Sequence, residues 1–172
     1  MRRIILYLLV LISSVSYSQN TLEKLLKQYN DNGVPYISAE ELAMPKTKDV
    51  ILLDSREPKE FNVSHLKGAI CVGYDNFNLD SVTTQLPNKN QKIVVYCSLG
   101  IRSETIAERL KAVGYTNVEN LYGGIFEWKN KNFSVYNTSN KETDSIHTFN
   151  KDWSKWLKKG IKVYEKEVAE KK

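Results

Sequence analysis

Apolar positions along this chain gather into short runs separated by mixed and polar stretches. Two runs, residues 50–53 and 93–96, have no polar interruption and are rich in branched aliphatic side chains. A run of this kind predicts a strand that is buried on both faces, as in a parallel sheet. Weaker runs predict further short strands at residues 35–37, 68–72 and 118–121.

Between these strands the pattern changes to the three- and four-residue spacing of helices. In residues 103–113, Ile106, Ala107 and Leu110 recur on one face, and Gly114 is placed to end the helix. Strands that alternate with helices predict a parallel α/β sheet with helices on both faces. The length of 172 residues suits a single domain. The other expected helices are residues 20–31, 39–44, 58–63 and 79–86, with a short one after Gly123 and Gly124.

Cys97 falls where the apolar run 93–96 gives way to the helix 103–113. At such a junction the N–H groups of the loop and the helix dipole stabilise an anion. These groups are expected to lower the pKa of the thiol, and Arg102 adds a positive charge at the same place. The alternative is that Cys97 is a small buried hydrophobic residue, a common fate of free cysteines. The combination of strand, glycine loop and arginine favours a catalytic nucleophile.

Residues 1–18 have the pattern of a secretory signal peptide. Arg2 and Arg3 precede the apolar run 4–12, and small residues close the segment. Nine apolar residues are too few to cross a bilayer of about 30 Å, so no stable membrane anchor is expected. We expect a mature chain that starts near Gln19 and is periplasmic or secreted. Removing two of the 25 basic residues lowers the formal net charge from +5 to +3.

The last part of the chain is polar and rich in lysine. Residues 136–172 are expected to form a helical extension, in which a connecting loop over 137–148 leads to a helix from Phe149 that is broken at Gly160. Its aromatic face is expected to pack on the domain, and a partner-binding face is the alternative. The lysines favour a solvated surface, and no nucleic-acid partner is expected. The side chains of the aromatic face are Phe149, Trp153, Trp156 and Leu157.

Cys71 and Cys97 are the only cysteines of the sequence. In an oxidising compartment a disulfide between them has to be considered, but Cys97 is better explained as a free nucleophile. A free thiol outside the cytoplasm needs a reducing partner, such as a thiol reductant protein. The sequence has no His, Cys and Asp cluster with metal-ligand spacing and no glycine-rich nucleotide loop, so no metal or cofactor is expected.

Three ordered segments resemble the signatures of the rhodanese family. LDSREPKEF at residues 53–61, followed by SHLKGAI at 64–70, is similar to the N-terminal signature. CSLGIRS at 97–103 is similar to the active-site loop, and residues 121–128 to the C-terminal signature. With their flanking residues the segments cover about Tyr36 to Lys131, more than half of the chain, and their order makes the resemblance specific.

The resemblance implies a rhodanese-like three-layer α/β/α fold with a five-stranded parallel sheet. The corresponding domain organisation is a signal peptide at 1–18, an N-terminal helix within 19–35, a rhodanese-like domain at 36–135 and the helical extension at 136–172. The signatures themselves leave the leader, the first helix and everything after residue 135 outside the match.

The resemblance also implies a thiosulfate sulfurtransferase-like activity. Cys97 would accept sulfane sulfur from a small anionic donor such as thiosulfate and would pass it, through a persulfide, to cyanide or a thiol. Arg102 would help to bind the donor, and the loop N–H groups would stabilise the anion without a general base. The substrate-binding loop implied in this way consists of Ser98, Leu99, Gly100, Ile101, Arg102 and Ser103.

Four residues outside the loop are expected to support it. Asp54 either braces the loop or packs at the end of its strand. Arg56 and Glu60 are spaced to form a structural ion pair. His65 is expected to be a buried, hydrogen-bonded histidine and not a catalytic group.

The sequence departs from the rhodanese signatures at two positions. Ser55 stands where the family commonly has a branched apolar residue, and Ser64 where it commonly has a glycine. Both changes are expected to alter packing and not activity.

Two alternative functions remain. A persulfide carrier or partner-binding module with little turnover is the first. The second is a relative of the cysteine phosphatases or arsenate reductases, whose loop is one residue longer. Four residues between Cys97 and Arg102 favour sulfur chemistry.

Overall fold

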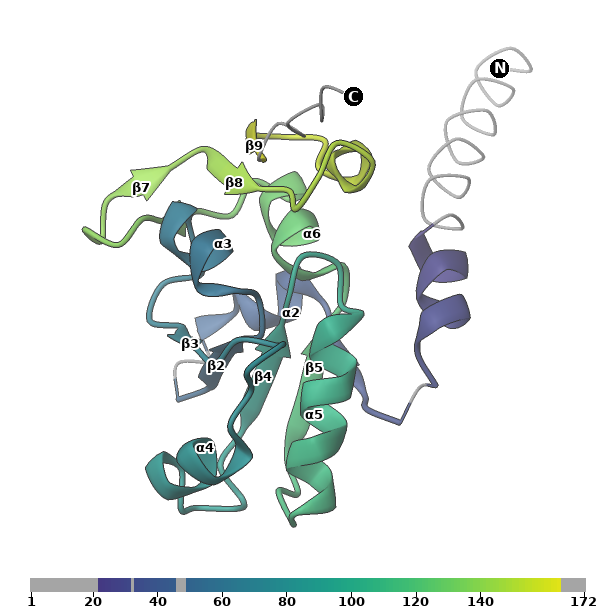
Figure 1. Cartoon of the computed structure of the whole chain (residues 1–172), viewed down its shortest axis with the longest axis vertical. Helices are drawn as coiled ribbons and strands as arrows, with labels where there is room; N and C mark the ends of the chain where they lie inside the picture. Colours follow the sequence, from purple (N-terminus) through teal and green to yellow (C-terminus); the bar gives the residue numbers. More distant parts are fainter. Residues whose placement is uncertain (1–21, 32, 46–48, 165–172) are drawn as a thin grey trace, which may run out of the picture. The chain divides into compact units, whose positions relative to one another are not determined.

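The computed structural model describes residues 22–31, 33–45 and 49–164 (Figure 1). The centre of the domain is a five-stranded sheet in which all neighbouring strands are parallel, in the order β1-β5-β4-β2-β3. The predicted parallel α/β sheet is thus confirmed. Its strands are β1 (Tyr36–Ile37), β2 (Ile51–Asp54), β3 (Ile70–Cys71), β4 (Ile93–Tyr96) and β5 (Val118–Leu121).

In the described part of the domain, five helices connect or flank these strands. Ser38 starts α2 with a capping box, in which its Oγ accepts from the N–H of Glu41 (3.2 Å) and the Glu41 carboxylate accepts from the N–H of Ser38 (3.0 Å). Pro58 occupies the first turn of α3, and the side chain of Asn78 caps α4. These local signals explain why the helices start where the sequence pattern places them. The helices are α2 (Ala39–Leu42), α3 (Pro58–Val63), α4 (Leu79–Gln85), α5 (Arg102–Ala112) and α6 (Gly124–Asn130).

The hydrophobic core lies between the sheet and helices α4 and α5. β4 is the central strand, and all four of its side chains are buried. Ile93 and Val95 of this strand form one apolar cluster with Val82 of α4 and with Ile106 and Leu110 of α5. Successive side chains of a strand point to opposite faces of the sheet, so Ile93 and Val95 belong to this cluster and the other two side chains of β4 point to the opposite face.

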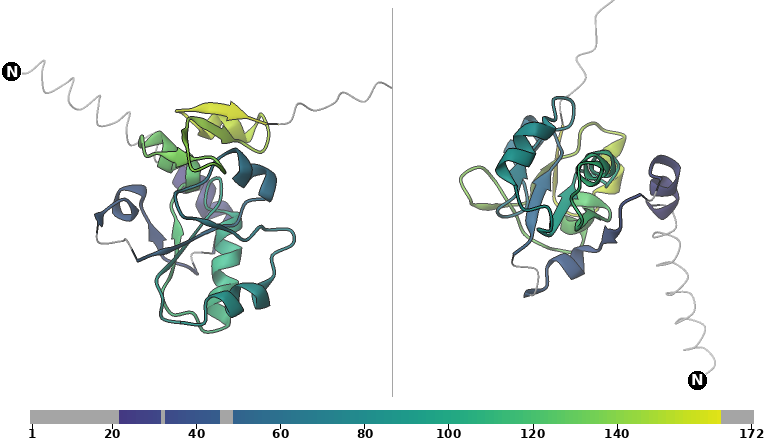
Figure 2. Two further views of the ribbon diagram at one scale, coloured as in Figure 1. Left: turned by 90° about the vertical axis from the view of Figure 1, so that its left-hand side faces the viewer. Right: turned by 90° about the horizontal axis from the view of Figure 1, so that it is seen from below.

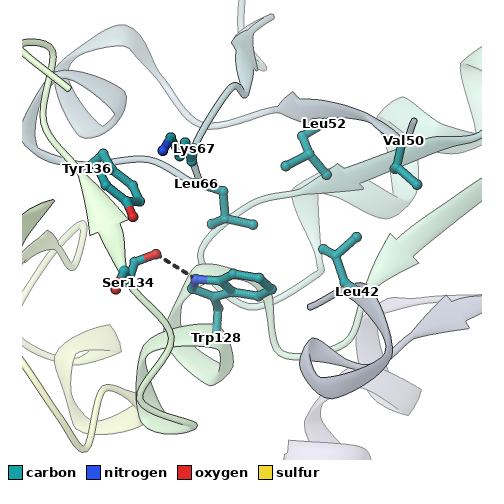
Figure 3. A pocket seen from close by; sticks show the side chains of 8 residues that line it. All are labelled: Leu42, Val50, Leu52, Leu66, Lys67, Trp128, Ser134 and Tyr136. Atoms are coloured by element: carbon teal, nitrogen blue, oxygen red, sulfur yellow. Dashed lines mark hydrogen bonds between the residues drawn. The ribbon is translucent and has the colours of Figure 1, made fainter. Parts of the chain in front are cut away.

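Helices α2 and α6 cover the other face of the sheet. Leu52 of β2, Leu42 of α2 and Trp128 of α6 line a common pocket of about 290 Å³ there (Figure 3). The indole N–H of Trp128 donates to the carbonyl of Ser134 (2.9 Å), which fixes the ring along the wall of the pocket. The sheet therefore has helices on both faces, as predicted.

The structure corrects the prediction of a helical C-terminal extension. In the part that is described, the extension consists of short strands and one 3₁₀ turn, and the segment predicted as a connecting loop holds two of the strands. The N–H of Thr148 donates to the carbonyl of Val163 (2.7 Å), a pairing of distant residues that local spacing does not reveal. The elements are β6 (Val135–Tyr136), β7 (Glu142–Thr143), β8 (Ser145–His147), η2 (Trp153–Trp156) and β9 (Ile161–Val163).

The extension packs on the domain through α6 and α3 (Figures 1 and 2). Lys129 Nζ lies 2.5 Å from an Asp144 carboxylate oxygen, and the side chain of Asn130 donates to the carbonyl of Trp156 (3.1 Å). Leu157 is fully buried. Phe149, which was predicted to share the face of Leu157, is instead 49% exposed.

The N-terminal residues form a unit separate from residues 33–172. Within it, residues 22–29 are helical, as predicted for the leading helix. The predicted signal peptide and the predicted start of this helix at residue 20 lie outside the described residues. Among the residues that the structure describes, no helix combines the length and apolar character needed to span a membrane.

Candidate active site

The site forms around the loop that joins β4 to α5. Cys97 follows directly after β4, and α5 begins at Arg102. The carbonyls of Cys97 and Ser98 accept hydrogen bonds from the N–H groups of Ile125 (2.9 Å) and Phe126 (3.2 Å), in the first turn of α6. The peptide groups at the start of the loop are therefore fixed with their carbonyls toward α6.

Gly124 allows this close contact between α6 and the loop. Its φ of 55° is in the left-handed region, where residues with a Cβ are strained. A Cβ at this position would lie 2.7 Å from the carbonyl oxygen of Ser98 and would collide with the carbonyl of Cys97 as well. Gly124, the second of the two glycines that the sequence places after β5, thus shapes the nucleophile loop.

The sulfur of Cys97 lies within a ring of donors. The N–H of Gly100 donates to Sγ (3.1 Å), and Ser103 Oγ lies 3.5 Å from it. Gly100 has a φ of 103°, and a Cβ there would come 3.3 Å from the carbonyl oxygen of Leu121. Cys97 is only 2% exposed, so these donors act with little competition from water.

The surroundings of Cys97 favour its thiolate. Burial by itself would raise the pKa of Cys97, because the charged form loses solvation. The positive charge of Arg102 and the donors of Ser103 and Gly100 outweigh burial, and the pKa is lowered from its ordinary value. A thiol of this kind is ionised at lower pH than an ordinary cysteine and is a stronger candidate nucleophile.

Arg102 is held by Glu60 in a two-point ion pair. Nη1 and Nη2 each donate to one carboxylate oxygen of Glu60 at 2.8 Å, and Nη2 also contacts Ser98 Oγ (3.3 Å). Burial disfavours the Glu60 carboxylate, but the contact with Arg102 prevails, and the pKa of Glu60 is lowered. Helix α3 therefore fixes the arginine that begins α5.

This arrangement corrects the predicted ion pair between Arg56 and Glu60. The guanidinium of Arg56 instead grips Asp54, with Nε–Oδ1 and Nη2–Oδ2 distances of 2.9 and 2.6 Å, and Nη2 donates to the carbonyl of Ser64 (2.7 Å). Arg56 precedes α3, so helical spacing does not place it beside Glu60. Asp54 consequently braces its own strand end through Arg56.

A family model described as "Rhodanese-like domain" matches residues 38–131, which is more than half of the chain. The chain belongs to the rhodanese family. Among curated proteins it is 37% identical over 83 residues to the tRNA uridine(34) hydroxylase of Listeria welshimeri, an alignment that covers 45% of this chain and 25% of that protein. The chain thus spans about a quarter of the length of this relative.

Two solved structures illustrate the likeness of the fold. A rhodanese-related protein from Thermoplasma volcanium is 26% identical, with a TM-score of 0.51 over 59% of this chain and 96% of that one. A thiosulfate sulfurtransferase from Pseudomonas aeruginosa is 20% identical, with a TM-score of 0.58 over 81% of this chain and 26% of that one. At the second identity the likeness shows the fold alone.

Asn120 is a part of this rhodanese site that the sequence analysis missed. It is fully buried near the end of β5, and its Nδ2 donates to the carbonyl of Gly100 and to the carboxylate of Glu104, both at 2.8 Å. Its Oδ1 accepts from Ser103 Oγ (2.7 Å), so the Ser103 hydroxyl donates to Asn120 and the backbone N–H of Ser103 is the donor that remains for the sulfur of Cys97. The signal was an asparagine inside a predicted strand that ends at the same sheet edge as β4.

Three further residues of the predicted loop are Ser98, Leu99 and Ile101. Ser98 and Leu99 are buried, and Ser98 Oγ donates to Glu60 (3.3 Å). Ile101 is the residue before α5, and its carbonyl accepts from the N–H of Glu104 (3.2 Å). Glu60 and Asn120 hold the two sides of this loop through Arg102 and the carbonyl of Gly100.

His65 and Cys71 take no part in the ring of donors around the nucleophile. His65 is buried, its Nδ1 is 3.1 Å from the carbonyl of Phe61, and its ring stacks on that of Phe61. Cys71 and Cys97 are both free thiols. Burial, and then the charge of Asp54, raise the pKa of Cys71. Among the described residues, no group of three His, Cys, Asp or Glu side chains could hold a metal ion.

Proposed function

We propose that this protein is a sulfurtransferase that carries sulfane sulfur as a persulfide on Cys97. The observation that supports this most directly is the buried Cys97 thiol, whose pKa is lowered and whose sulfur accepts the Gly100 N–H at 3.1 Å. Thiolate character is what a sulfur-accepting nucleophile needs. Membership of the rhodanese family supports the same chemistry, and so does the short loop of four residues between Cys97 and Arg102.

The proposed reaction has two steps. The Cys97 thiolate attacks the outer sulfur of thiosulfate, a new S–S bond forms, and the bond to the sulfonate sulfur breaks as sulfite leaves with the electron pair. The persulfide anion that remains on Cys97 then gives its outer sulfur to cyanide, forming thiocyanate, or to a thiolate, forming a new persulfide. The Cys97 thiolate is regenerated, and the N–H of Gly100 faces the sulfur that is negative at the start and the end of the cycle.

A persulfide carrier with little turnover is the second candidate. Two observations support it: Arg102 is neutralised by Glu60, and Cys97 is only 2% exposed. Both features would slow the entry of a dianionic donor without preventing the storage of one sulfur. The relative from Listeria welshimeri named tRNA uridine(34) hydroxylase matches this chain over 25% of its own length, so a role of this domain inside a larger protein fits the carrier as well.

Intact-mass analysis after incubation with thiosulfate tests both candidates. We expect an adduct of about 32 Da, one sulfur atom, that maps to Cys97 and is removed by cyanide. Cys97→Ala should abolish loading and transfer, whereas Cys71→Ala should retain most of both. Rapid turnover would assign the enzyme, and loading of one sulfur with negligible turnover would assign the carrier. No adduct, or equal losses in the two variants, would refute the assignment of Cys97.

We further propose that the protein is exported and that a thiol reductant protein keeps Cys97 reduced. The support is the charged start, the nine-residue apolar run and the small residues that follow it. Mass spectrometry of the protein purified from its native host should give a mature N-terminus near Gln19. A retained Met1 would contradict the proposal.

A further inference from the structure

Phe149 is an aromatic residue in a strained turn. Its φ is 63°, and the N–H of Asn150 donates to the carbonyl of Thr148 (2.7 Å) across it. A hydrogen bond between residues i and i+2 around a positive φ defines the rare form of γ-turn, which is strained for a residue with a Cβ. The ring nevertheless remains 49% exposed, so burial of the side chain does not explain the strain.

The surrounding structure holds this turn in place. Thr148 is buried, and its N–H donates to the carbonyl of Val163 in β9 (2.7 Å). The N–H of Phe149 donates to Nδ1 of His147, the last residue of β8, at 3.1 Å. β8 in turn packs on α3, the helix that carries Glu60. Strained residues that are fixed by their surroundings are concentrated at functional sites.

The turn places the Phe149 ring beside Arg102, the arginine next to Cys97. The guanidinium carbon of Arg102 lies 5.8 Å from the centre of the ring, within the range of a cation–π contact. The side chain of Arg102 is 21% exposed, while its charge acts on the sulfur of Cys97. In Figures 1 and 2 the segment from β8 to η2 lies next to α3 and α6, beyond the end of the sheet at which β4 leads into the loop.

A partly exposed guanidinium beside an exposed aromatic ring suits a small organic molecule with a negative charge. Within the part of the chain that the structure describes, Glu60 and Ser98 use three of the five N–H donors of Arg102. Nε and one N–H of Nη1 are left for an anionic group, next to an apolar ring. A single half-exposed ring is far smaller than a protein interface, which buries about 800 Å² per partner.

We propose that Phe149 is a specificity-determining residue that binds the organic part of a low-molecular-weight thiol acceptor carrying a carboxylate. This inference rests on the proposed sulfur transfer, because a thiol acceptor is defined by that reaction. The ring packs against the carbon skeleton of the acceptor, and Arg102 binds its carboxylate. Cyanide, which has no carbon skeleton, gains nothing from the ring.

The first experiment compares acceptors for the Cys97 persulfide. N-acetylcysteine has an organic body and a carboxylate, N-acetylcysteamine has the body alone, and cyanide has neither. In Phe149→Ala we expect kcat/KM for each thiol, relative to that for cyanide, to fall about three- to tenfold, the range that one aromatic contact provides. The wild-type protein should also prefer N-acetylcysteine to N-acetylcysteamine. An unchanged thiol-to-cyanide ratio in Phe149→Ala, or no preference for the carboxylate, would overturn the proposal.

Ile161→Ala is the matched control, since Ile161 is a large apolar residue of the same extension and is 61% exposed. It should leave all three rates unchanged. Phe149→Gly provides a second variant that tolerates the positive φ and therefore keeps the turn if Phe149→Ala fails to fold. Both ring-less variants should show the same loss of selectivity. A loss that is equal in Ile161→Ala would assign the effect to the extension as a whole and would contradict the role of Phe149.

A second experiment keeps the inference separate from sulfur transfer. Cys97 is alkylated with iodoacetamide or with iodoacetanilide, which adds a phenyl ring to the same reactive group. We expect the ratio of the iodoacetanilide rate to the iodoacetamide rate to fall about threefold or more in Phe149→Ala and Phe149→Gly. If this rate ratio falls as expected but thiosulfate never loads sulfur on Cys97, the proposed function is refuted and the subsite for an aromatic or organic group stands. An unchanged or increased ratio would refute the subsite.

Discussion

At the scale of single residues, the site is a balance of charges around one sulfur atom. Burial disfavours the Cys97 thiolate, and the charge of Arg102 together with the donors of Ser103 and Gly100 restores it. Arg102 in turn depends on Glu60, which is fully buried and would be an unfavourable charge without its partner. The nucleophile is therefore supported by a chain of pairings that starts in α3.

Replacing Glu60 by Gln should lower the free energy of unfolding at neutral pH by about 2 kcal/mol, because Arg102 then loses a charged partner. The folded-state pKa of Glu60 is lowered, so its contribution is complete above the unfolded-state value of about 4.3 and is lost as the pH falls through the folded-state value. Urea unfolding should therefore show a wild-type advantage at pH 7 that narrows in acid.

The matched control for Glu60 is Glu40→Gln. Glu40 pairs with Lys131 at 2.7 Å, but both side chains are substantially exposed. An exposed pair of this kind is worth less than about 0.5 kcal/mol. Similar losses in the two variants would mean that burial of the Arg102 pair has no special weight.

The sequence identified the nucleophile more readily than its supports. Cys97 and Arg102 belong to one short loop, so local order and the family motif were sufficient to find them. Asn120 and Glu60 reach the loop from β5 and α3, and their role depends on which elements the fold brings together. Arg56 was assigned to Glu60 on helical spacing, although it lies before the helix begins.

At the scale of elements, the position of the nucleophile loop depends on the start of α6. Two N–H groups of its first turn bind the carbonyls of Cys97 and Ser98, in place of partners within the helix. The strands and helices of the domain were predicted to within a few residues, because apolar runs and caps are local signals. The extension was predicted wrongly, because Trp153, Trp156 and Leu157 have a spacing that fits one 3₁₀ turn as well as a helix.

Gly124→Ala tests the contact between α6 and the loop. The added Cβ would meet the Ser98 carbonyl at 2.7 Å and would also pay for a left-handed φ, so we expect a loss of about 3 kcal/mol in stability. The rate of Cys97 alkylation at neutral pH should fall as well, since the loop has to move. Thermal unfolding and alkylation kinetics measure the two effects.

Gly114→Ala is the control that separates the effect of backbone strain from the effect of steric collision in Gly124→Ala. Gly114 also has a positive φ, of 96°, but a Cβ there would have nothing within 4 Å. This variant should lose about 1 kcal/mol and keep the normal alkylation rate of Cys97. If Gly124→Ala behaved in the same way, the close packing of α6 on the loop would not be what shapes the site.

At the scale of the whole domain, the extension is part of the folded unit that holds the site. Leu157 and Ile146 are fully buried, and Lys129 and Asn130 of α6 bind residues of the extension. The family model ends at residue 131, before this extension begins. Rhodanese signatures therefore predict the sheet and the nucleophile, but not the segment that carries Phe149.

Leu157→Ala should lower the free energy of unfolding by about 2–4 kcal/mol, because a fully buried side chain is truncated. Ile161→Ala, at an exposed position, should change it by less than about 0.5 kcal/mol. Far-UV circular dichroism and tryptophan fluorescence should report one common transition in each variant. Separate transitions would show that the extension unfolds independently of the sheet.

The tight fit around the Cys97 sulfur has a consequence for the stored form of the protein. A persulfide places a second sulfur about 2 Å beyond the first, and the negative charge moves outward with it. The Gly100 N–H, now 3.1 Å from the inner atom, can follow that charge only if the backbone shifts. The persulfide form and the sulfur-free form would then differ in the conformation of the loop, and a partner could distinguish them by shape before any sulfur is transferred.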